Sequence, residues 1–404
     1  MTDKAWLTVI GIGEDGLDGL GAQARAALDL AEVLVGGARH LDMVPARDGQ
    51  SRQTWPSPFS EGLDRIVSLR GRRVCILASG DPMMFGVGAS LSRRLHEGEM
   101  RVIPAPSSFS LAAARLGWPL QDCVTLTVHG RSVDGIRRHI QPNARLLILS
   151  EGGNSPARVA QALTAMGYGP SRLWVLEHLG GPRERIVDAS AATWNRDDVA
   201  DLNLVAVECA ADLGVPALPT LAGLPDAAFH HEGQITKRDV RVATLARLAP
   251  CPGQLLWDVG AGCGSVAIEW MRTHPACRAV AIEGKAERVA LIEANTQTLG
   301  TPGLAIVAGN APEALHGLEA PDAVFIGGGL TREGVFPACW QALKPGGRLV
   351  ANAVTLQGEA LVAALYQKLG GELTRISVAQ AGPLGGFDGW RTAMPVTLLT
   401  LVKA

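Results

Sequence analysis

A short apolar run followed by three closely spaced glycines constrains the second half of this chain more than any other feature. The run Leu255–Val259 leads into Gly260, Gly262 and Gly264, and an amphipathic segment begins at Ser265. Glycine lets the backbone turn sharply, and the helix that follows points its free amide groups and positive end at an anionic part of a ligand. The segment therefore predicts a strand, a tight turn and a helix that together bind a ligand.

The spacing of this motif favours a nucleoside ligand. Asp258 precedes the glycines in the pattern D-x-G-x-G-x-G, and Ser265 stands where a G-x-G-x-x-G dinucleotide motif would need glycine. Glu283 ends the next apolar run, near the spacing of about 20 residues that is typical of a ribose-binding acid. A glycine turn alone can serve packing only. The acid at Glu283 and a third loop at Asn310, after a further strand, disfavour that alternative.

Length and composition predict two α/β domains. At about 100–200 residues per domain, 404 residues correspond to two domains, and an apolar content of 47% suffices for two buried cores. Glycine and proline gather between residues 211 and 233 with little periodicity, as is typical of a linker. We place the first domain at residues 1–210, the linker at 211–228 and the second domain at 229–404.

Apolar runs alternate with amphipathic segments in both domains, which predicts alternating strands and helices. In the first domain we expect strands at 7–12, 74–78, 146–150, 173–176 and 204–207, and helices at 22–31, 87–96, 109–116 and 157–166. In the second domain we expect a doubly wound, mostly parallel sheet that ends in a hairpin-like pair. Its seven strands are predicted at 255–259, 279–283, 305–307, 323–326, 348–351, 373–378 and 396–402.

Charge and cysteine content exclude several classes of function. The 37 Lys and Arg residues nearly balance 39 Asp and Glu residues, so no bulk positive charge attracts nucleic acid or an anionic membrane. The seven cysteines include no C-x-x-C pair, which disfavours a disulfide framework or a structural zinc site and fits a reducing cytoplasm. No apolar run approaches 18 residues, and Glu14 and Asp15 end the run Trp6–Ile12, which we interpret as a strand rather than a signal peptide.

The motifs of the second domain resemble class I S-adenosylmethionine (SAM) methyltransferases. The resemblance implies that Glu283 binds the ribose hydroxyls, although Asn310 stands where the family usually has Asp. Cys263 is interpreted as filler rather than a nucleophile, because no histidine adjoins it in sequence. The implied SAM contacts come from the glycine loop and the adenine loop: Gly260, Ala261, Gly262, Cys263, Gly264, Glu283, Asn310 and Ala311.

The first domain carries a different set of motifs. Gly11, Gly13 and Gly16 match G-x-G-x-x-G, but the second strand ends in glycine rather than in the acid that an NAD site needs. Loop residues also follow apolar strands in segments 78–86, 104–112, 128–131, 151–156 and 176–186. This set resembles the tetrapyrrole (corrin and siroheme) methylase family, which implies two subdomains with SAM in the cleft between them. The residues implied to lie near that SAM are Gly13, Gly80, Asp81, Met84, Ser108 and Gly130.

At two positions of the first domain, the resemblance does not decide the role of the residues. The family often has a Gly-Pro-Gly turn where this chain has Glu14-Asp15-Gly16. Asp81 precedes Pro82, and an Asp-Pro pair is equally typical of a plain turn.

The pairing of the two modules resembles the family of bifunctional precorrin-6B (precorrin-6Y) C5,15-methyltransferases (decarboxylating) of cobalamin biosynthesis. Segments 234–241, 321–329 and 344–356 carry the match in the second domain. The resemblance implies a tetrapyrrole substrate and two SAM sites, one per domain. It implies C5 methylation by the first domain, and C15 methylation with loss of the C12 acetate carboxyl as carbon dioxide by the second, giving precorrin-8. Both modules tend to self-associate, so we expect a homo-oligomer.

Substrate contacts can be named only as candidates. Lys237, Arg238 and Arg391 suit the peripheral carboxylates of a tetrapyrrole, although ordinary solvated charges are as typical of such positions. Thr236 matches a family position beside SAM, and no residue stands out as a catalytic proton donor. Two alternatives remain open, an NAD-dependent oxidoreductase and a non-catalytic regulator that binds SAM or a tetrapyrrole.

Overall fold

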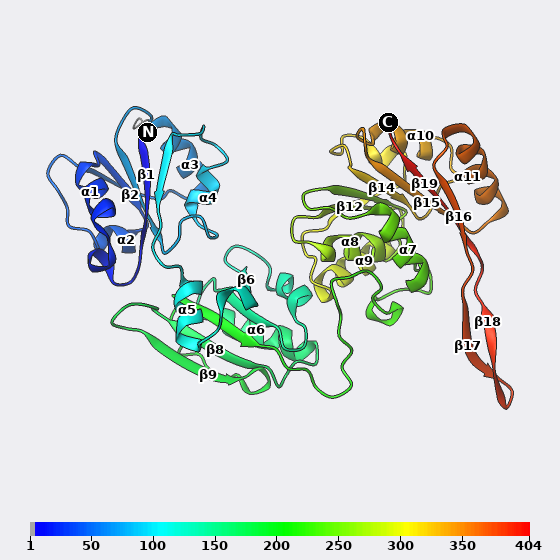
Figure 1. The fold of residues 1–404 in the computed structure, drawn as a ribbon, viewed down its shortest axis with the longest axis horizontal. Coiled ribbons are helices and arrows are strands. Elements are labelled where there is room, and N and C mark those ends of the chain that lie inside the picture. Colours follow the sequence, from blue (N-terminus) through cyan, green and yellow to red (C-terminus); the bar gives the residue numbers. More distant parts are fainter. Residues whose placement is uncertain (1–4) are drawn as a thin grey trace. The chain divides into compact units, whose positions relative to one another are not determined.

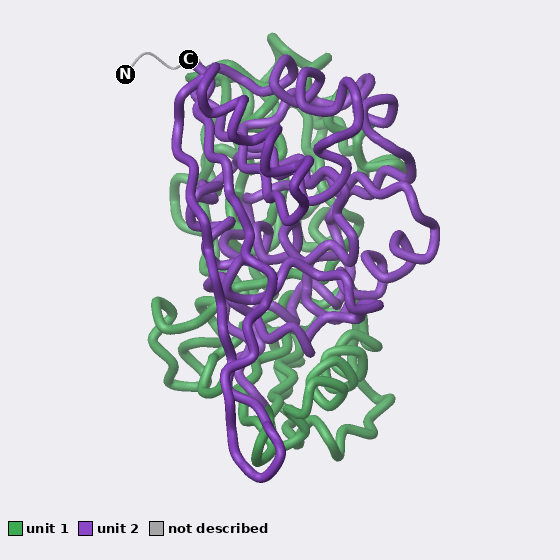
Figure 2. Tube along the Cα trace, turned by 90° about the vertical axis from the view of Figure 1, so that its right-hand side faces the viewer, with its two compact units in different colours: residues 1–131, 142–215 green, residues 132–141, 216–404 purple. Residues whose placement is uncertain are grey.

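The structure is a computed structural model, and it describes residues 5–404 of the chain (Figure 1). By internal contacts the chain divides into two compact units (Figure 2). Within the described range, unit 1 comprises residues up to 131 together with 142–215, and unit 2 comprises 132–141 and 216–404. No helix in this range is both long and apolar enough to cross a membrane.

Unit 1 begins with a five-stranded parallel sheet in the order β3-β2-β4-β1-β5. Side chains alternate between its two faces, as the period of a strand requires. Ile10 and Ile12 pack with helices α1 and α2 on one face, whereas Leu7 and Val9 pack with α3 and α4 on the other. The elements are β1 (Leu7–Ile12), α1 (Ala22–Leu30), β2 (Val33–Gly36), α2 (Ala38–Asp42), β3 (Ser51–Thr54), α3 (Phe59–Ser68), β4 (Val74–Ser79), α4 (Val87–Leu91) and β5 (Met100–Ile103).

A second five-stranded sheet completes unit 1, in the order β6-β7-β10-β8-β9. Only β6 and β7 pair in parallel, and the other neighbours are antiparallel. Helix α5 covers one face, where Phe109 and Ala112 pack on Leu147 and Leu176. The elements are α5 (Ser108–Leu116), β6 (Cys123–Thr127), β7 (Arg145–Leu149), α6 (Ser155–Ala165), β8 (Arg172–Glu177), β9 (Arg185–Ser190) and β10 (Asn203–Glu208).

Unit 2 contains a seven-stranded sheet in the order β13-β12-β11-β14-β15-β19-β16. Strand β19 is antiparallel to both of its neighbours, and the other pairs are parallel. The elements are α7 (Arg238–Leu248), β11 (Leu255–Val259), α8 (Ser265–Thr273), β12 (Arg278–Glu283), α9 (Ala286–Thr298), β13 (Ala305–Ala308), β14 (Ala323–Ile326), α10 (Val335–Ala342), β15 (Arg348–Ala353), α11 (Leu356–Leu369), β16 (Glu372–Ile376), β17 (Ala379–Leu384), β18 (Phe387–Thr392) and β19 (Val396–Val402).

Apolar side chains on both faces of this sheet explain why it is doubly wound. Leu256 and Phe325 pack with α7 and α8 on one face, whereas Trp257 and Ile326 pack with α10 and α11 on the other. Strands that are buried on both faces are continuous apolar runs, which is the pattern that predicted this class of fold. The α/β class is therefore confirmed in both units.

Three features depart from the sequence-based expectations. A two-stranded antiparallel ribbon, β17–β18, is inserted between β16 and β19 and extends from the sheet of unit 2 (Figure 1). Helix α4 ends at Leu91, before the predicted end at residue 96. Leu224, in the predicted linker, is buried in the core of unit 2.

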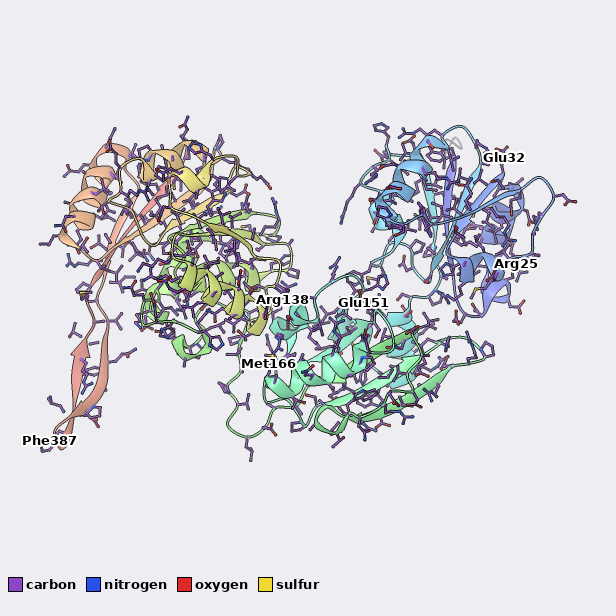
Figure 3. All side chains as sticks on the ribbon, turned by 180° about the vertical axis from the view of Figure 1, so that it is seen from behind. Arg25, Glu32, Arg138, Glu151, Met166 and Phe387 are labelled. Carbon is purple, nitrogen blue, oxygen red and sulfur yellow. The ribbon has the colours of Figure 1, made fainter. Side chains whose placement is uncertain are left out.

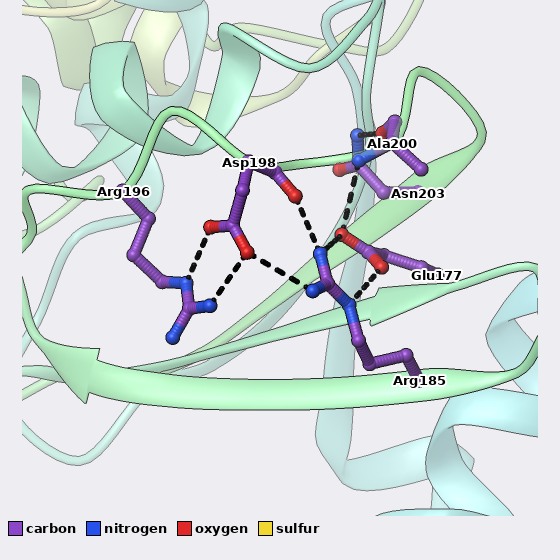
Figure 4. A network of polar contacts seen from close by, with 6 residues as sticks. All are labelled: Glu177, Arg185, Arg196, Asp198, Ala200 and Asn203. Atoms are coloured by element: carbon purple, nitrogen blue, oxygen red, sulfur yellow. Dashed lines mark hydrogen bonds and ion pairs between the residues drawn. The ribbon is translucent and has the colours of Figure 1, made fainter.

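An ion-pair network surrounds Glu177, the last residue of β8, where the second sheet of unit 1 passes into a loop (Figure 4). Arg185 donates to both oxygens of the buried Glu177 carboxylate, at 2.6 and 2.9 Å, and pairs with Asp198 at 3.0 Å. The backbone amide of Ala200 donates to Glu177 Oε1 at 3.0 Å. These bonds, Arg185 foremost, lower the pKa of Glu177. The network thereby holds the end of β8 against the segment that precedes β10.

We expect Glu177→Gln to destabilise the protein by about 1.5–3 kcal/mol at pH 7, the range for hydrogen bonds to charged groups. Because the pKa of Glu177 is lowered by folding, its contribution is present above the ordinary pKa and is lost as the pH falls through the lowered value. The difference between wild type and variant in urea denaturation should therefore shrink below pH 4.5. Glu208→Gln, which breaks a half-exposed pair with Arg145, is the control and should cost less than about 1 kcal/mol. A difference that stayed constant with pH would contradict the linkage.

Candidate active sites in the two units

The loops that follow β1, β4 and β5 meet at one edge of the first sheet of unit 1. A Cβ atom on Gly11 would lie 1.9 Å from the carbonyl oxygen of Gly80 and 2.5 Å from the amide nitrogen of Ala105, so only glycine fits there. The same loops are joined by backbone hydrogen bonds, from Gly80 N to Ile12 O and from Ala105 N to Gly80 O, both at 3.1 Å. Carboxyl ends of parallel strands are where open α/β sheets bind ligands.

A cavity of about 740 Å³ opens at this edge and extends to the second sheet of unit 1. Apolar side chains such as Phe85 and Leu176 share its wall with polar groups. Gly130 itself does not line the cavity, although its neighbours His129 and Arg131 do. Five of the six residues that the sequence predicted near a ligand line it: Gly13, Gly80, Asp81, Met84 and Ser108.

Asp81 has a structural role in the cavity wall. Its Oδ1 accepts a hydrogen bond from the amide of Met83 at 2.8 Å, which is the turn that an Asp-Pro pair predicts. The loop that it shapes presents Met83, Met84 and Phe85 as exposed apolar side chains, and Phe85 has a positive φ of 55°. A non-glycine residue in this region is uncommon and worth attention at a ligand site.

Sequence reasoning missed a charged cluster in the same cavity. Glu14 forms an ion pair with Arg39 and a hydrogen bond with His178 Nδ1 at 3.1 Å, and Arg183 lies 3.9 Å away. Burial, followed by the charge of Arg183, lowers the pKa of His178. Glu14 and His178 are 164 positions apart in the chain, so no local pattern could pair them.

A second histidine of the cavity, His40, is held neutral by its surroundings. Burial and the neighbouring guanidinium of Arg39 lower the pKa of His40 to about 4. Its Nε2 lies 3.0 Å from both Ser79 Oγ and Arg39 Nη2. This nitrogen is therefore already engaged within the wall of the cavity.

In unit 2 the glycine loop has the predicted geometry. Gly260, Gly262 and Gly264 have positive φ values of 70°, 62° and 80°. A Cβ atom on Gly260 would lie 2.7 Å from the Cα atom of Gly328, in the loop after β14. The loops after β11 and β14 are thus in backbone contact, which side chains would prevent.

The predicted ribose acid lies beside this loop. Glu283 is buried, and its carboxylate accepts hydrogen bonds from Gly262 N at 2.8 Å and Lys285 N at 3.0 Å. Gly309 N donates to the carbonyl of Glu283 at 2.9 Å, and a Cβ atom on Gly284 would lie 2.2 Å from Asn310 Oδ1. The structure therefore brings the glycine loop, Glu283 and the Asn310–Ala311 loop together.

Two further residues of the glycine loop serve the interior. Asp258 is buried, its Oδ2 accepts from Ala267 N at 3.0 Å, and burial raises its pKa to about 7. Cys263 is buried as well, burial raises the pKa of its thiol, and its carbonyl oxygen accepts from Asn295 Nδ2 at 2.9 Å. A buried thiol of raised pKa is a poor nucleophile, as the sequence interpretation expected.

The segment that contains Thr236 lies against the glycine loop. A Cβ atom on Gly262 would lie 3.7 Å from the carbonyl oxygen of Gln234. Arg241, which is fully buried, donates to the carbonyl of Thr236 at 2.5 Å and to Glu269 at 2.6 Å. This buried arginine fixes the backbone of the segment from inside the unit.

The three candidate substrate contacts, Lys237, Arg238 and Arg391, lie in two different parts of unit 2. Lys237 and Arg238 are exposed and follow Thr236 directly, and Lys237 lies 3.8 Å from Asp226. Arg391 lies on β18 of the ribbon, where its Nη2 donates to the carbonyl of Pro383 at 2.7 Å. Arg238 Nε would lie 3.8 Å from a Cβ atom on Gly223. The structure therefore places Lys237 and Arg238 close in sequence to the segment at Gln234 that touches the glycine loop, and Arg391 on a separate element. Within residues 5–404, no His, Cys, Asp and Glu side chains gather in a group that could hold a metal ion.

Comparison with known proteins identifies the family. A family model described as tetrapyrrole (corrin/porphyrin) methylases matches residues 6–194, and one described as a precorrin methyltransferase domain matches residues 227–403. A precorrin-6Y C(5,15)-methyltransferase [decarboxylating] of Sinorhizobium sp is 51% identical over 398 residues, which cover 98% of this chain and 96% of that protein. The chain belongs to the precorrin-6Y C(5,15)-methyltransferase (decarboxylating) family.

Two shorter proteins are each similar to about half of this family member. A cobalt-precorrin-7 C(5)-methyltransferase of Salmonella typhimurium is 31% identical over 45% of this chain and 88% of its own length. A protein of Pyrobaculum calidifontis named "Probable cobalt-precorrin-6B C(15)-methyltransferase (decarboxylating)" is 34% identical over 44% of this chain and 94% of its own length.

We expect the Glu283→Ala variant to bind SAM more weakly at one of two sites, by more than 1 kcal/mol, on the order of a charge-assisted hydrogen bond. Calorimetric titration of the full chain with SAM should show two sites in the wild type and one weakened site in the variant. Glu287→Ala, in the first turn of α9 and exposed, is the matched control and should titrate as the wild type. Two unchanged sites in Glu283→Ala would refute this role of Glu283.

Proposed function

We propose that this chain is a bifunctional methyltransferase of cobalamin biosynthesis whose two units carry out different steps on one tetrapyrrole. Residues 1–210 would methylate precorrin-6B at C5. Residues 229–404 would methylate C15 and remove the C12 acetate carboxyl as carbon dioxide, giving precorrin-8. The observation that carries this proposal is the presence of one ligand-binding edge with glycine loops in each unit. The two half-length relatives, each named for one of the two methylations, support the division.

Methyltransferases of this kind take their methyl group from SAM, which supplies an electrophilic methyl on a sulfonium. The residues of both units fit such a ligand. In unit 2, the Glu283 carboxylate uses two of about four acceptor positions for backbone amides, so acceptors remain for the two ribose hydroxyls. In unit 1, Gly13, Gly80, Asp81, Met84 and Ser108 border a cavity large enough for a nucleoside and part of a macrocycle. We therefore propose two SAM sites, whose contacts are the residues predicted from the sequence except Gly130, which does not line the cavity, and Cys263, whose side chain is buried.

Positioning accounts for most of what the chain must contribute to methyl transfer. Ring carbons of a reduced tetrapyrrole are electron-rich, and placing the carbon in line with the sulfonium can contribute about 7–11 kcal/mol. Backbone turns that cannot shift, such as those at Gly11 and Gly260, suit this task.

Decarboxylation in unit 2 requires that cationic side chains bind some carboxylates of the substrate but not the one that is lost. A cation on the departing carboxylate would stabilise the ground state, whereas cations on the other carboxylates hold the macrocycle in place. We propose that Lys237 and Arg238, which are exposed and follow the segment that touches the glycine loop at Gln234, bind peripheral carboxylates. Arg391 is a weaker candidate, because its side chain is bonded within the ribbon.

We further propose that copies of the chain associate, and that the protein works in the cytoplasm without nucleic-acid or membrane partners. The ribbon β17–β18 supports association, because Leu384, Phe387 and Trp390 are 69%, 84% and 77% exposed. Phe387 lies at the free end of the ribbon (Figure 3). Exposed apolar groups on a two-stranded ribbon with open edges are a surface that a second copy of the same ribbon can cover.

In light scattering, the wild type should have at least twice the mass of one chain. The double variant Phe387→Ser, Trp390→Ser should have a lower mass at the same concentration, because it removes the apolar surface that association would bury. Leu221→Ser, which is 77% exposed outside the ribbon, is the control and should keep the wild-type mass. A monomeric wild type would refute association.

The division of labour is tested with labelled SAM and precorrin-6B. The wild type should transfer two methyl groups and release one carbon dioxide per macrocycle. Glu283→Ala should lower C15 methylation and decarboxylation and leave C5 methylation unchanged. Gly13→Leu, in the wall of the unit 1 cavity, where a Cβ atom would lie 2.6 Å from Asp15 Oδ1, should do the reverse. The assignment of the units is wrong if Glu283→Ala impairs C5 methylation alone, and no label transfer by the wild type would refute the activity.

A further inference from the structure

Two loops from different sheets of unit 1 bring a carboxylate and an imidazole together in the cavity wall. Glu14 follows β1 of the first sheet, and His178 follows β8 of the second sheet. Glu14 Oε2 lies 3.1 Å from His178 Nδ1, and both residues line the cavity. Their side chains are only 10% and 15% exposed, so the pair is shielded from bulk water.

The backbone holds His178 in an uncommon conformation to make this contact. Its φ is 47°, a left-handed value that costs a non-glycine residue free energy. Hydrogen bonds from His178 N to Leu202 O at 3.1 Å and from Gly181 N to His178 O at 3.0 Å fix the turn. A Cβ atom on Gly181 would lie 2.6 Å from Glu14 Cβ, so the loop can lie on Glu14 only because this residue is glycine. Such over-determined strain is typical of functional positions.

The hydrogen bond to Glu14 sets the state of the imidazole. An ionised carboxylate only accepts, so Nδ1 carries the hydrogen and Nε2 keeps a free lone pair. The charged groups around the ring are Glu14 after β1, Arg39 on α2, Arg183 in the loop after β8 and Glu177 at the end of β8. Burial and the two guanidinium groups lower the pKa of His178, so the ring is neutral near pH 7.

Other polar groups of the cavity are less suited to accept a proton. The carboxylate of Asp81 is bonded to the Met83 amide, and His40 Nε2 is engaged by Ser79 and Arg39. Glu14 itself is paired with Arg39, and His129 is exposed. Because Arg39 can only donate, His40 Nε2 is its acceptor, and the partnerless Nδ1 of His40 carries the hydrogen. Of the two shielded histidines of the cavity wall, His178 is thus the one with a ring nitrogen that can still accept a proton.

We propose that His178, oriented by Glu14, is the proton acceptor for C5 methylation in unit 1. This inference rests on the proposed function of that unit. The C5–CH₃ bond forms with a π-electron pair of the macrocycle, and the S–CH₃ bond breaks with its pair left on sulfur. The hydrogen on C5 then leaves as a proton to His178 Nε2, and the C–H electron pair restores the π bond. The imidazolium that forms is stabilised by the Glu14 carboxylate.

The kinetic test uses the full chain with His178→Gln, which keeps a polar side chain of similar length. The kcat of C5 methylation should fall on the order of 10²-fold, the lower end for loss of a general base, while KM for the tetrapyrrole stays within about twofold. The decrease in wild-type rate on acidification through the pKa of His178 should be absent in the variant. Calorimetric binding of SAM at the unit 1 site reports on the folding of that unit, and His96→Gln, an exposed histidine of unit 1 outside the cavity, is the matched control.

A substrate deuterated at C5 separates proton transfer from a structural role. With His178→Gln, proton loss should limit the rate and give a primary isotope effect that is larger than in the wild type. A raised KM with unchanged kcat would instead make His178 a substrate-binding group and overturn the proposal, as would an unchanged isotope effect. If the wild type itself did not methylate C5, the proposed function of unit 1 would fail, which is a distinct outcome.

An NMR measurement without SAM or substrate tests the same pair independently of activity. In protein with ¹⁵N-labelled histidine, the ring nitrogens of His178, assigned by comparison with His178→Gln, should show the Nδ1–H form with an unprotonated Nε2 at pH 7. In Glu14→Gln this preference should weaken, because the amide can both donate and accept. Observation of the Nε2–H form in the wild type would overturn the assignment of Nε2 as the acceptor.

Discussion

The close approach of backbone to backbone at the carboxyl ends of parallel strands is the constraint on which both candidate sites depend. At Gly11 a side chain would meet the carbonyl of Gly80 at 1.9 Å, and at Gly260 it would meet the backbone of Gly328 at 2.7 Å. Backbone cannot move aside as the end of a side chain can, so these two positions have no substitute for glycine. The resulting contacts place loops from several strands within reach of one ligand.

The sequence predicted this part of the structure well, because the responsible signals are local. Buried parallel strands are continuous apolar runs, and the glycines, Asp258 and Glu283 follow them at fixed spacings. The ribbon β17–β18 could not be predicted in the same way, since its strands are exposed on both sides and carry little apolar periodicity. The contact between Glu14 and His178 could not be predicted from the sequence either. Both residues lie in motifs that could be singled out, but only the packing of two sheets shows that they touch.

The two units handle buried charge in different ways. In unit 2, Arg241 is fully buried, and Glu269, Asp226 and two backbone carbonyls accept its hydrogen bonds, so the group is satisfied and serves the fold. In unit 1, the Glu14 cluster lies in a cavity wall, and its histidine keeps an acceptor atom without a described partner. Polar groups in protein interiors are normally satisfied, so a histidine of the cavity wall with one ring nitrogen lacking a described partner is the more informative observation. With a formal net charge of −2, recognition of a polycarboxylate must come from local groups of this kind.

Sequence order and packing do not divide this chain at the same place. The segment Ser132–Gln141 includes the 3₁₀ helix Val133–His139. It belongs to unit 2, although the residues before and after it in sequence belong to unit 1. A Cβ atom on Gly300 would lie 2.5 Å from the backbone nitrogen of Arg138, and burial followed by Arg138 and Arg272 lowers the pKa of His139 to about 4. A fragment that began at the linker would lack the segment Ser132–Gln141. It would therefore expose the surface of unit 2 that this segment covers and leave a gap beside Gly300. Two half-length relatives are each named for one methylation, whereas in this chain the second unit is completed by residues from the first half.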